Sequence, residues 1–281
     1  MLRRDAGQDW LLITQHDHAV LSGRLGAHIG NAVFARPEPR DAVLAAFSLH
    51  DAGWPLHDDR PTLNPQGIPC HVFEATIDSA MAVWPASADR AAESAGPYAA
   101  LLVSLHVLGL STMIAQHLQT AKLTVPERNQ LQFRLNKFQH HEIERQENLR
   151  RKLGLSTDLP LHLGLAAPGS GPDEDNLRVN FRLLQAVDRI SLTLCCTGLL
   201  FPQIEEIPPR PGAAPLTLHL RHDPGGALAI TPWLFDAPTL SFKIPARRLA
   251  KNSFSSEQQF QSAYAAASSE ELPVALAEPP P

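Results

Sequence analysis

The stretch that decides the expected fold is AAFSLHDAGW, residues 45–54. It closes a predicted helix in which Val43, Phe47 and His50 share one face at the i, i+4 and i+7 spacing. His50 takes a place where this pattern calls for an apolar side chain, and Asp51 follows directly. A buried imidazole or carboxylate is costly unless it is paired or coordinated. The stretch therefore calls for a cation or for strong hydrogen-bond partners.

Two further predicted helices break the apolar pattern in the same way. His18 lies on the apolar stripe of the helix expected over residues 18–34, and Asp188 takes the next place in an apolar series within the helix expected over about residues 176–200. One such residue is more often a core hydrogen-bonder that other protein groups satisfy. Three helices that each place a His or Asp there favour metal coordination, because divalent transition metals select imidazole and carboxylate ligands.

The remaining sequence up to about residue 205 predicts more helices separated by proline-rich loops. An apolar helix that opens at Pro97 is expected to be the central buried helix. Thr124 and Glu127 form a capping-box pattern that starts a long charged helix, and Gly154 ends it.

The pattern then changes to alternation of apolar and polar residues in LTLHLRH, ALAIT and TLSFKIP, followed by a short helix around residues 257–267. We therefore expect a mainly α fold, with a small antiparallel sheet and a short helix near the carboxyl end. The expected division is a helical metal-binding domain (1–205), a small β-rich appendage (206–267) and a disordered tail (268–281).

Composition narrows the class of partner. The 24 Lys and Arg residues against 29 Asp and Glu residues give a net charge of -5, which disfavours a nucleic-acid binder. We find no apolar run of the roughly 18–20 residues that would span a bilayer, and the opening MLRRDAGQDW lacks the apolar core of a signal peptide. The three cysteines cannot build a disulfide framework. We expect a cytoplasmic protein that acts on a small molecule, without nucleic acid or membrane as partner.

The order His18, then His50-Asp51, then Asp188 resembles the H…HD…D signature of the HD-domain metal-dependent phosphohydrolases. The interval of 32 residues between His18 and His50 is similar to the usual gap of that superfamily. The segments QHDHAVLSG, HDAGW, PYAALLVSLH and TPWLF also resemble a bacterial family of unknown function that looks like a divergent HD branch. Two departures are the interval of 137 residues from Asp51 to Asp188, long for the superfamily, and Gly53-Trp54 in place of the usual glycine-lysine.

The resemblance implies an HD-like helical bundle that binds one or two divalent ions (Mn, Mg, Zn, Ni or Fe). The implied metal ligands are His18, His50, Asp51 and Asp188. The implied reaction is hydrolysis of a small phosphate ester or nucleotide by a metal-activated water molecule. Asp51, which could bridge a second ion, and His106, on the apolar helix, are the candidate catalytic residues. His28 is the alternative to His18 as first ligand.

Three other residues are candidates for binding substrate. His57 and Arg60 follow HDAGW in an irregular loop, and Arg189 flanks Asp188. The alternative is that the loop residues are plain solvated surface and that Arg189 pairs with an acidic neighbour.

Two other functions stay open at this level. A di-iron oxygenase of the HD type would need six ligands, with His71 and His106 as the additional two. A helical module that binds a metal or ligand without turnover would need no catalytic group at all.

Overall fold

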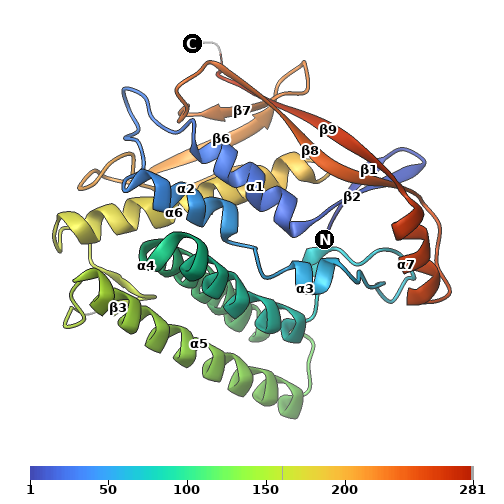
Figure 1. Cartoon of the computed structure of the whole chain (residues 1–281), viewed down its shortest axis with the longest axis horizontal. Helices are drawn as coiled ribbons and strands as arrows, with labels where there is room; N and C mark the ends of the chain where they lie inside the picture. The colour runs from blue at the N-terminus through green and yellow to red at the C-terminus, as the bar shows by residue number, and fades with distance from the viewer. Residues whose placement is uncertain (160, 280–281) are drawn as a thin grey trace.

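The structure is a computed structural model of the chain, and it describes residues 1–159 and 161–279. It is about 48% helical and 20% strand. Its elements form three layers (Figure 1): a curled sheet, a middle layer of helices beneath it, and an outer pair of helices on the far side. The middle layer is α1 (Gln15–Gly26), α2 (Arg40–Leu49) and α6 (Pro172–Cys195), and the outer layer is α4 (Ile77–Leu118) and α5 (Val125–Leu153).

Short elements connect these layers. The segment between α2 and α4 contains α3 (Pro55–Asp58) and the single turn η1 (Val72–Glu74). A two-stranded ribbon, β3 (Leu161–His162) and β4 (Leu165–Ala166), lies between α5 and α6. The last helix, α7 (Glu257–Ala266), joins two strands of the main sheet and packs at its edge (Figure 1).

The main sheet has seven strands in the order β1-β2-β8-β9-β7-β6-β5. All neighbours are antiparallel except β7 and β9, which are parallel, so the sheet is mixed. Its strands are β1 (Leu2–Ala6), β2 (Asp9–Ile13), β5 (Gln203–Ile207), β6 (Leu216–His222), β7 (Leu228–Thr231), β8 (Thr239–Ala250) and β9 (Ser268–Ala277).

The prediction of a mainly α fold with a small antiparallel sheet is wrong, because this mixed sheet is a major element. It contains strands from both ends of the chain: β2 pairs with β8, with Asp9 opposite Ala250. The boundary predicted at residue 206 falls inside β5. Residues 268–277, expected as part of a disordered tail, instead pair with β8 as β9, because alternate apolar side chains of β9 are buried on one face of the sheet.

The helix expected over residues 18–34 is shorter than predicted, because α1 ends at Gly26. The other predicted helices are present, and local signals define their ends. Thr124 and Glu127 make the capping box of α5, and Gly154 ends that helix with a left-handed backbone (φ 71°). In α4 the backbone leaves helical geometry at Gly96 (φ 82°), so the apolar half of this helix begins at Pro97 as expected.

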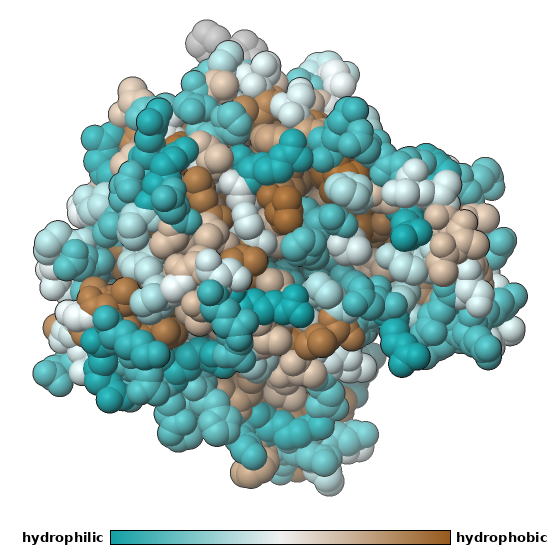
Figure 2. All heavy atoms as spheres, viewed as in Figure 1, coloured by the Kyte–Doolittle hydropathy of each residue, from teal (hydrophilic) through white to brown (hydrophobic). Residues whose placement is uncertain are grey.

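One finding differs from the expectation that no apolar run is long enough to span a membrane. By length and composition alone, α4 could do so, and 61% of its most apolar window is buried inside the protein. It packs between α2 and α5, which accounts for its apolar character as that of a core helix. The face of the molecule in Figure 2 is largely hydrophilic, with separate hydrophobic patches.

Candidate metal centre

Five buried His and Asp side chains meet where α1, α4, α6 and the end of α2 come together. They are His18 from α1, His50 at the C-cap of α2, Asp51 from the turn that follows, His106 from α4 and Asp188 from α6. Each helix buries the face on which its polar residue lies, as the apolar spacing predicts.

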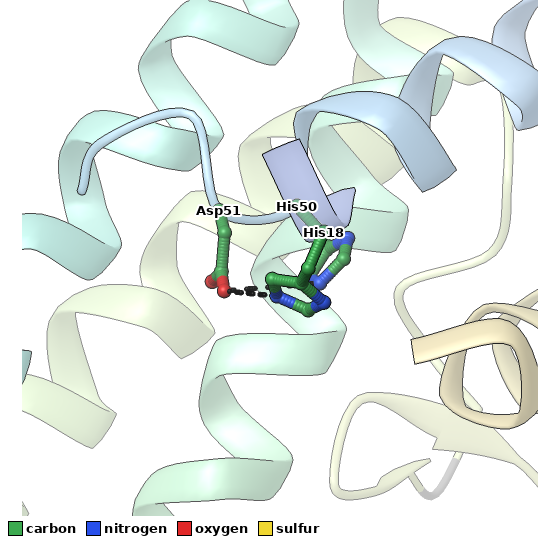
Figure 3. A group of neighbouring side chains, drawn as sticks. All are labelled: His18, His50 and Asp51. Atoms are coloured by element: carbon green, nitrogen blue, oxygen red, sulfur yellow. Dashed lines mark hydrogen bonds and ion pairs between the residues drawn. The ribbon is translucent and has the colours of Figure 1, made fainter. Parts of the chain in front are cut away.

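His18 and Asp51 make the closest contact of the centre. The Nε2 atom of His18 lies 2.9 Å from Oδ2 of Asp51, and Figure 3 shows the Asp51 carboxylate directed at the two imidazole rings. On the other side of the ring, Nδ1 of His18 lies 2.8 Å from the hydroxyl of Ser191. That hydroxyl donates to the backbone oxygen of Asp188 and therefore accepts from Nδ1–H. The lone pair of Nε2 then faces Asp51.

His50 is held in a similar way. Its Nδ1–H donates to the backbone oxygen of Phe47 at 2.8 Å, because a carbonyl oxygen can only accept. Its Nε2 is buried without a hydrogen-bond partner, 3.4 Å from Oδ1 of Asp188 and 3.9 Å from Oδ2 of Asp51. The one free nitrogen of His50 therefore lies between two carboxylates.

His106 completes the centre on the α4 side. Its Nε2 lies 3.8 Å from Oδ2 of Asp188, and its ring is 5.2 Å from the ring of His50, nearly perpendicular to it. Burial lowers the pKa of His106 to about 4, so this imidazole is neutral at pH 7.

The two carboxylates and His50 influence one another strongly. Burial lowers the pKa of His50, but the negative charges of Asp51 and Asp188 outweigh it and raise this pKa to about 9. Burial raises the pKa of Asp188, but its contact with His50 and the charge of that imidazole outweigh it and hold the pKa well below its usual range. The centre thus calls for a positive charge beside Nε2 of His50, as a proton or as a cation.

These buried groups could hold a metal ion. The ligand atoms of His18, His50 and Asp51 all lie within 4.8 Å of one another, and the same holds for His50, His106 and Asp188. Two ligands at about 2.1 Å from a common ion lie about 3.0–3.4 Å apart at tetrahedral or right angles. The spacings of 2.9 Å between His18 and Asp51 and 3.4 Å between His50 and Asp188 are close to this range. The spacings of 3.9 Å between His50 and Asp51 and 3.8 Å between His106 and Asp188 are wider, so these side chains would have to move by a few tenths of an ångström or bind at a wider angle.

The turn that follows α2 packs closely against α4, and this contact fixes the position of Asp51. The backbone N–H of Gly53 donates to the hydroxyl of Ser87 on α4 at 2.9 Å. A Cβ atom at Gly53 would lie 2.0 Å from the backbone oxygen of Val83. Glycine is therefore required at this position of the HDAGW segment, because any larger side chain would overlap the backbone of α4.

Sequence reasoning missed three polar residues that support the centre. Ser191 holds His18, Ser22 donates to the hydroxyl of Ser191 at 2.9 Å, and Nε2 of Gln15 donates to Asp51 at 3.0 Å. All three are buried, and each is three or four residues from a ligand on the same helix. That spacing, on a face already known to be buried, was the signal that could have identified them.

A cavity of about 440 Å³ opens beside the centre. His18, Asp51, His106 and Asp188 lie at its inner end, whereas His50 is behind them and does not line it. Most of the other lining side chains are apolar and come from α4 and from the segment between α2 and α4. Four of the five polar groups are therefore buried yet open to a molecule in the cavity, and His50 supports them from behind.

Two alternative ligands do not join the centre. His28 lies beyond the end of α1 and pairs with Asp236 at 3.0 Å, so His18, not His28, takes part. His71 caps η1, and its Nε2 contacts Sγ of Cys196 at 3.5 Å. A set of six ligands that includes His71 is not assembled.

The three candidate substrate-binding residues lie outside this cavity. His57 packs against Trp54, Arg60 is exposed and lines a separate cavity, and Arg189 lies over the ring of Phe201. Loop position and sequence adjacency did not predict where these side chains point.

The fold and the centre together define a class: a three-layer α and β protein with a buried centre of three histidines and two aspartates beside an apolar cavity. The chain belongs to the family described as "Protein of unknown function (DUF3891)", which matches residues 1–251. No curated protein and no solved structure matches the chain.

Proposed function

We propose that this protein is a metal-dependent hydrolase of the HD type, which cleaves a small phosphate ester. The observation that carries the proposal is the convergence of three histidines and two aspartates, four of which line the inner end of one cavity: His18, Asp51, His106 and Asp188, with His50 behind them. Five buried His and Asp side chains do not stabilise a core by packing, since burying polar groups without partners costs free energy. The adjoining cavity also gives a substrate access to these groups, which a reaction requires.

The two ligand groups favour one shared ion. They have only Nε2 of His50 in common, and the Nδ1 of His50 is already bonded to Phe47. One nitrogen lone pair binds one ion, so the groups that share it belong to a single centre. The imidazoles of His18 and His50 among the ligands favour Mn, Fe, Zn or Ni over Mg, because Mg prefers oxygen ligands.

A bound divalent cation would lower the pKa of a water molecule and withdraw electron density from a phosphoryl oxygen. The hydrolysis forms a bond from the water oxygen to phosphorus and breaks the ester P–O bond, and a proton passes to the alcohol oxygen that leaves. Among the protein groups, His106 faces the cavity with a neutral imidazole, and it can accept the proton of the attacking water when His18 and His50 are the imidazoles that bind the cation. Gln15 and Ser191 hold Asp51 and His18 in place.

Charge favours a monoester over a polyphosphate. Two carboxylates and one divalent cation sum to a formal charge near zero when the histidines are neutral. Among the described residues that line the cavity there is no Lys or Arg. A chain of phosphates would therefore lack the cations that usually neutralise it.

Metal analysis and turnover test the proposal. We expect His50→Ala and Asp51→Ala to lose metal and any activity on p-nitrophenyl phosphate, while helix content by circular dichroism stays near that of the unchanged protein. His28→Ala is the matched control, because His28 is a half-buried histidine paired with Asp236 outside the centre. Stoichiometric metal in both variants would contradict the site. Bound metal without phosphatase turnover in the unchanged protein would favour a non-catalytic module.

A further inference from the structure

The cavity beside the metal centre changes character from its inner end to its mouth. Its inner end carries the His and Asp side chains, and the rest of the wall is dominated by large apolar groups. Trp54 and Trp84 lie on the wall, and Phe73 and Met113 reach the surface with 61% and 46% of their area exposed. Exposed apolar side chains at the mouth of a cavity indicate contact with an apolar ligand group.

One face of α4 forms a track between the two ends. His106, Leu110, Met113, Ile114 and His117 line the cavity at helical spacing. Burial decreases along this series, from buried His106 through half-buried Leu110 to exposed Met113. From His106 to Met113 the helix rises about 11 Å, at 1.5 Å per residue. The space is elongated and opens outward from the metal centre.

Polar recognition along this track is sparse. Apart from the metal centre and the groups that hold it, the described polar residues that line the cavity are Thr76 and the exposed His117. The hydroxyls of a sugar would lose hydrogen bonds to water there without replacement. A hydrocarbon chain or ring loses nothing and gains about fourfold in affinity for each buried methylene, which corresponds to about 0.8 kcal/mol.

We infer that the substrate is a phosphate monoester of an elongated apolar alcohol, with its phosphate at the metal centre and its hydrocarbon group along α4. This inference rests on the proposed function, since it names the substrate class of the same site. It separates this protein from enzymes that act on nucleotides or sugar phosphates.

Binding of two phosphonates tests the ligand class without turnover. Hexylphosphonate and ethylphosphonate carry a P–C bond that is not hydrolysed, and they differ only by four methylenes. In calorimetric titrations of the Mn-loaded protein, we expect hexylphosphonate to bind at least about tenfold more tightly, which is well below the limit for four fully buried methylenes. Equal affinities, or tighter binding of adenosine monophosphate than of hexylphosphonate, would overturn the inference.

A pair of methionine variants locates the preference. Met113→Gln replaces an apolar side chain at the mouth by a polar one of similar size, and we expect it to lower the hexyl-to-ethyl affinity ratio by about threefold or more. Met81→Gln is the matched control, because Met81 lies on the same helix and lines a different cavity. An equal loss in both variants, or in neither, would contradict the assigned cavity.

Turnover of hexyl phosphate and ethyl phosphate separates this inference from the proposed function. Higher kcat/KM for the hexyl ester, together with the binding preference, supports both. A binding preference without turnover of either ester contradicts the hydrolase but supports the ligand class. Turnover of both esters at equal kcat/KM, without a binding preference, supports the hydrolase and overturns the substrate class.

Discussion

Replacing Ser191 by alanine is expected to weaken metal binding although Ser191 is not a ligand. Its hydroxyl accepts from Nδ1–H of His18 at 2.8 Å and donates to the backbone oxygen of Asp188 at 2.8 Å. These two bonds set both the ring orientation of His18 and the tautomer that directs its Nε2 lone pair at Asp51. In Ser191→Ala the imidazole is free to rotate or to place its proton on the wrong nitrogen.

The expected magnitude follows from the loss of this one orienting contact. Removing a group that orients a metal-bound histidine typically lowers metal affinity 10- to 100-fold, about 1.4–2.7 kcal/mol. The buried Nδ1–H of His18 also loses its partner, which costs about 1–3 kcal/mol of unfolding free energy in the metal-free protein. The variant should therefore fold, with reduced stability and a weaker site.

Competition with a chromogenic chelator measures the affinity for Zn²⁺, and urea unfolding of the metal-free protein measures stability. Ser22→Ala is the matched control, because Ser22 is a buried serine that bonds to the same hydroxyl and whose side chain has no described bond to the imidazole. We expect Ser22→Ala to keep its zinc affinity. A folded Ser191→Ala protein with unchanged zinc affinity would refute the role of Ser191.

Three further outcomes are expected. Gly53→Ala should cost about 1–3 kcal/mol in urea unfolding and weaken metal binding, because its Cβ would overlap the backbone of α4. Arg150→Ala should cost about 3–5 kcal/mol, since it leaves the buried Glu174 carboxylate without its ion-pair partner, whereas exposed Arg151→Ala should cost under about 1 kcal/mol. In the metal-free protein His50 is protonated below its pKa of about 9, so metal must displace that proton. Affinity should therefore rise about tenfold per pH unit from pH 7 to 9, and calorimetry in two buffers should detect about one released proton.

Helical periodicity made much of the centre predictable. His18, His50 and Asp188 each interrupt an apolar stripe within one helix, so the sequence near each residue was enough to mark it as buried and polar. Their convergence depends on how the helices pack. The sequence indicated this convergence only indirectly, because three separate helices each place a His or Asp on an apolar stripe.

The sheet was less predictable because its patterns are weak and its pairings are distant. β2 reads DWLLI, a short apolar run without alternation, and β1 carries two arginines. β9 does alternate Leu272, Val274 and Leu276, but Pro273 between them and the polar residues before them suggested a frayed end. Pairing with β8 and β7 makes this segment a strand, and the residues of the segment alone do not report these partners.

The positions of the loop candidates, outside the cavity beside the centre, were unpredictable for a related reason. His57, Arg60 and His71 lie in a segment without periodicity, so the direction of each side chain depends on turns that the residues alone do not define. His71 is an example: its ring caps η1 and contacts Cys196, and it belongs to neither group of candidate metal ligands.

The pairing of β2 with β8 joins two distant parts of the chain, and every His and Asp of the candidate metal centre lies in the segment between them. Thr14 alone separates β2 from α1. The strand that pairs with β8 therefore also positions the helix that contains His18. Closing so long a segment is entropically slow. The candidate metal centre should therefore be among the last parts of the molecule to form, and a chain interrupted before β8 should bind metal poorly even with all five of its His and Asp residues present.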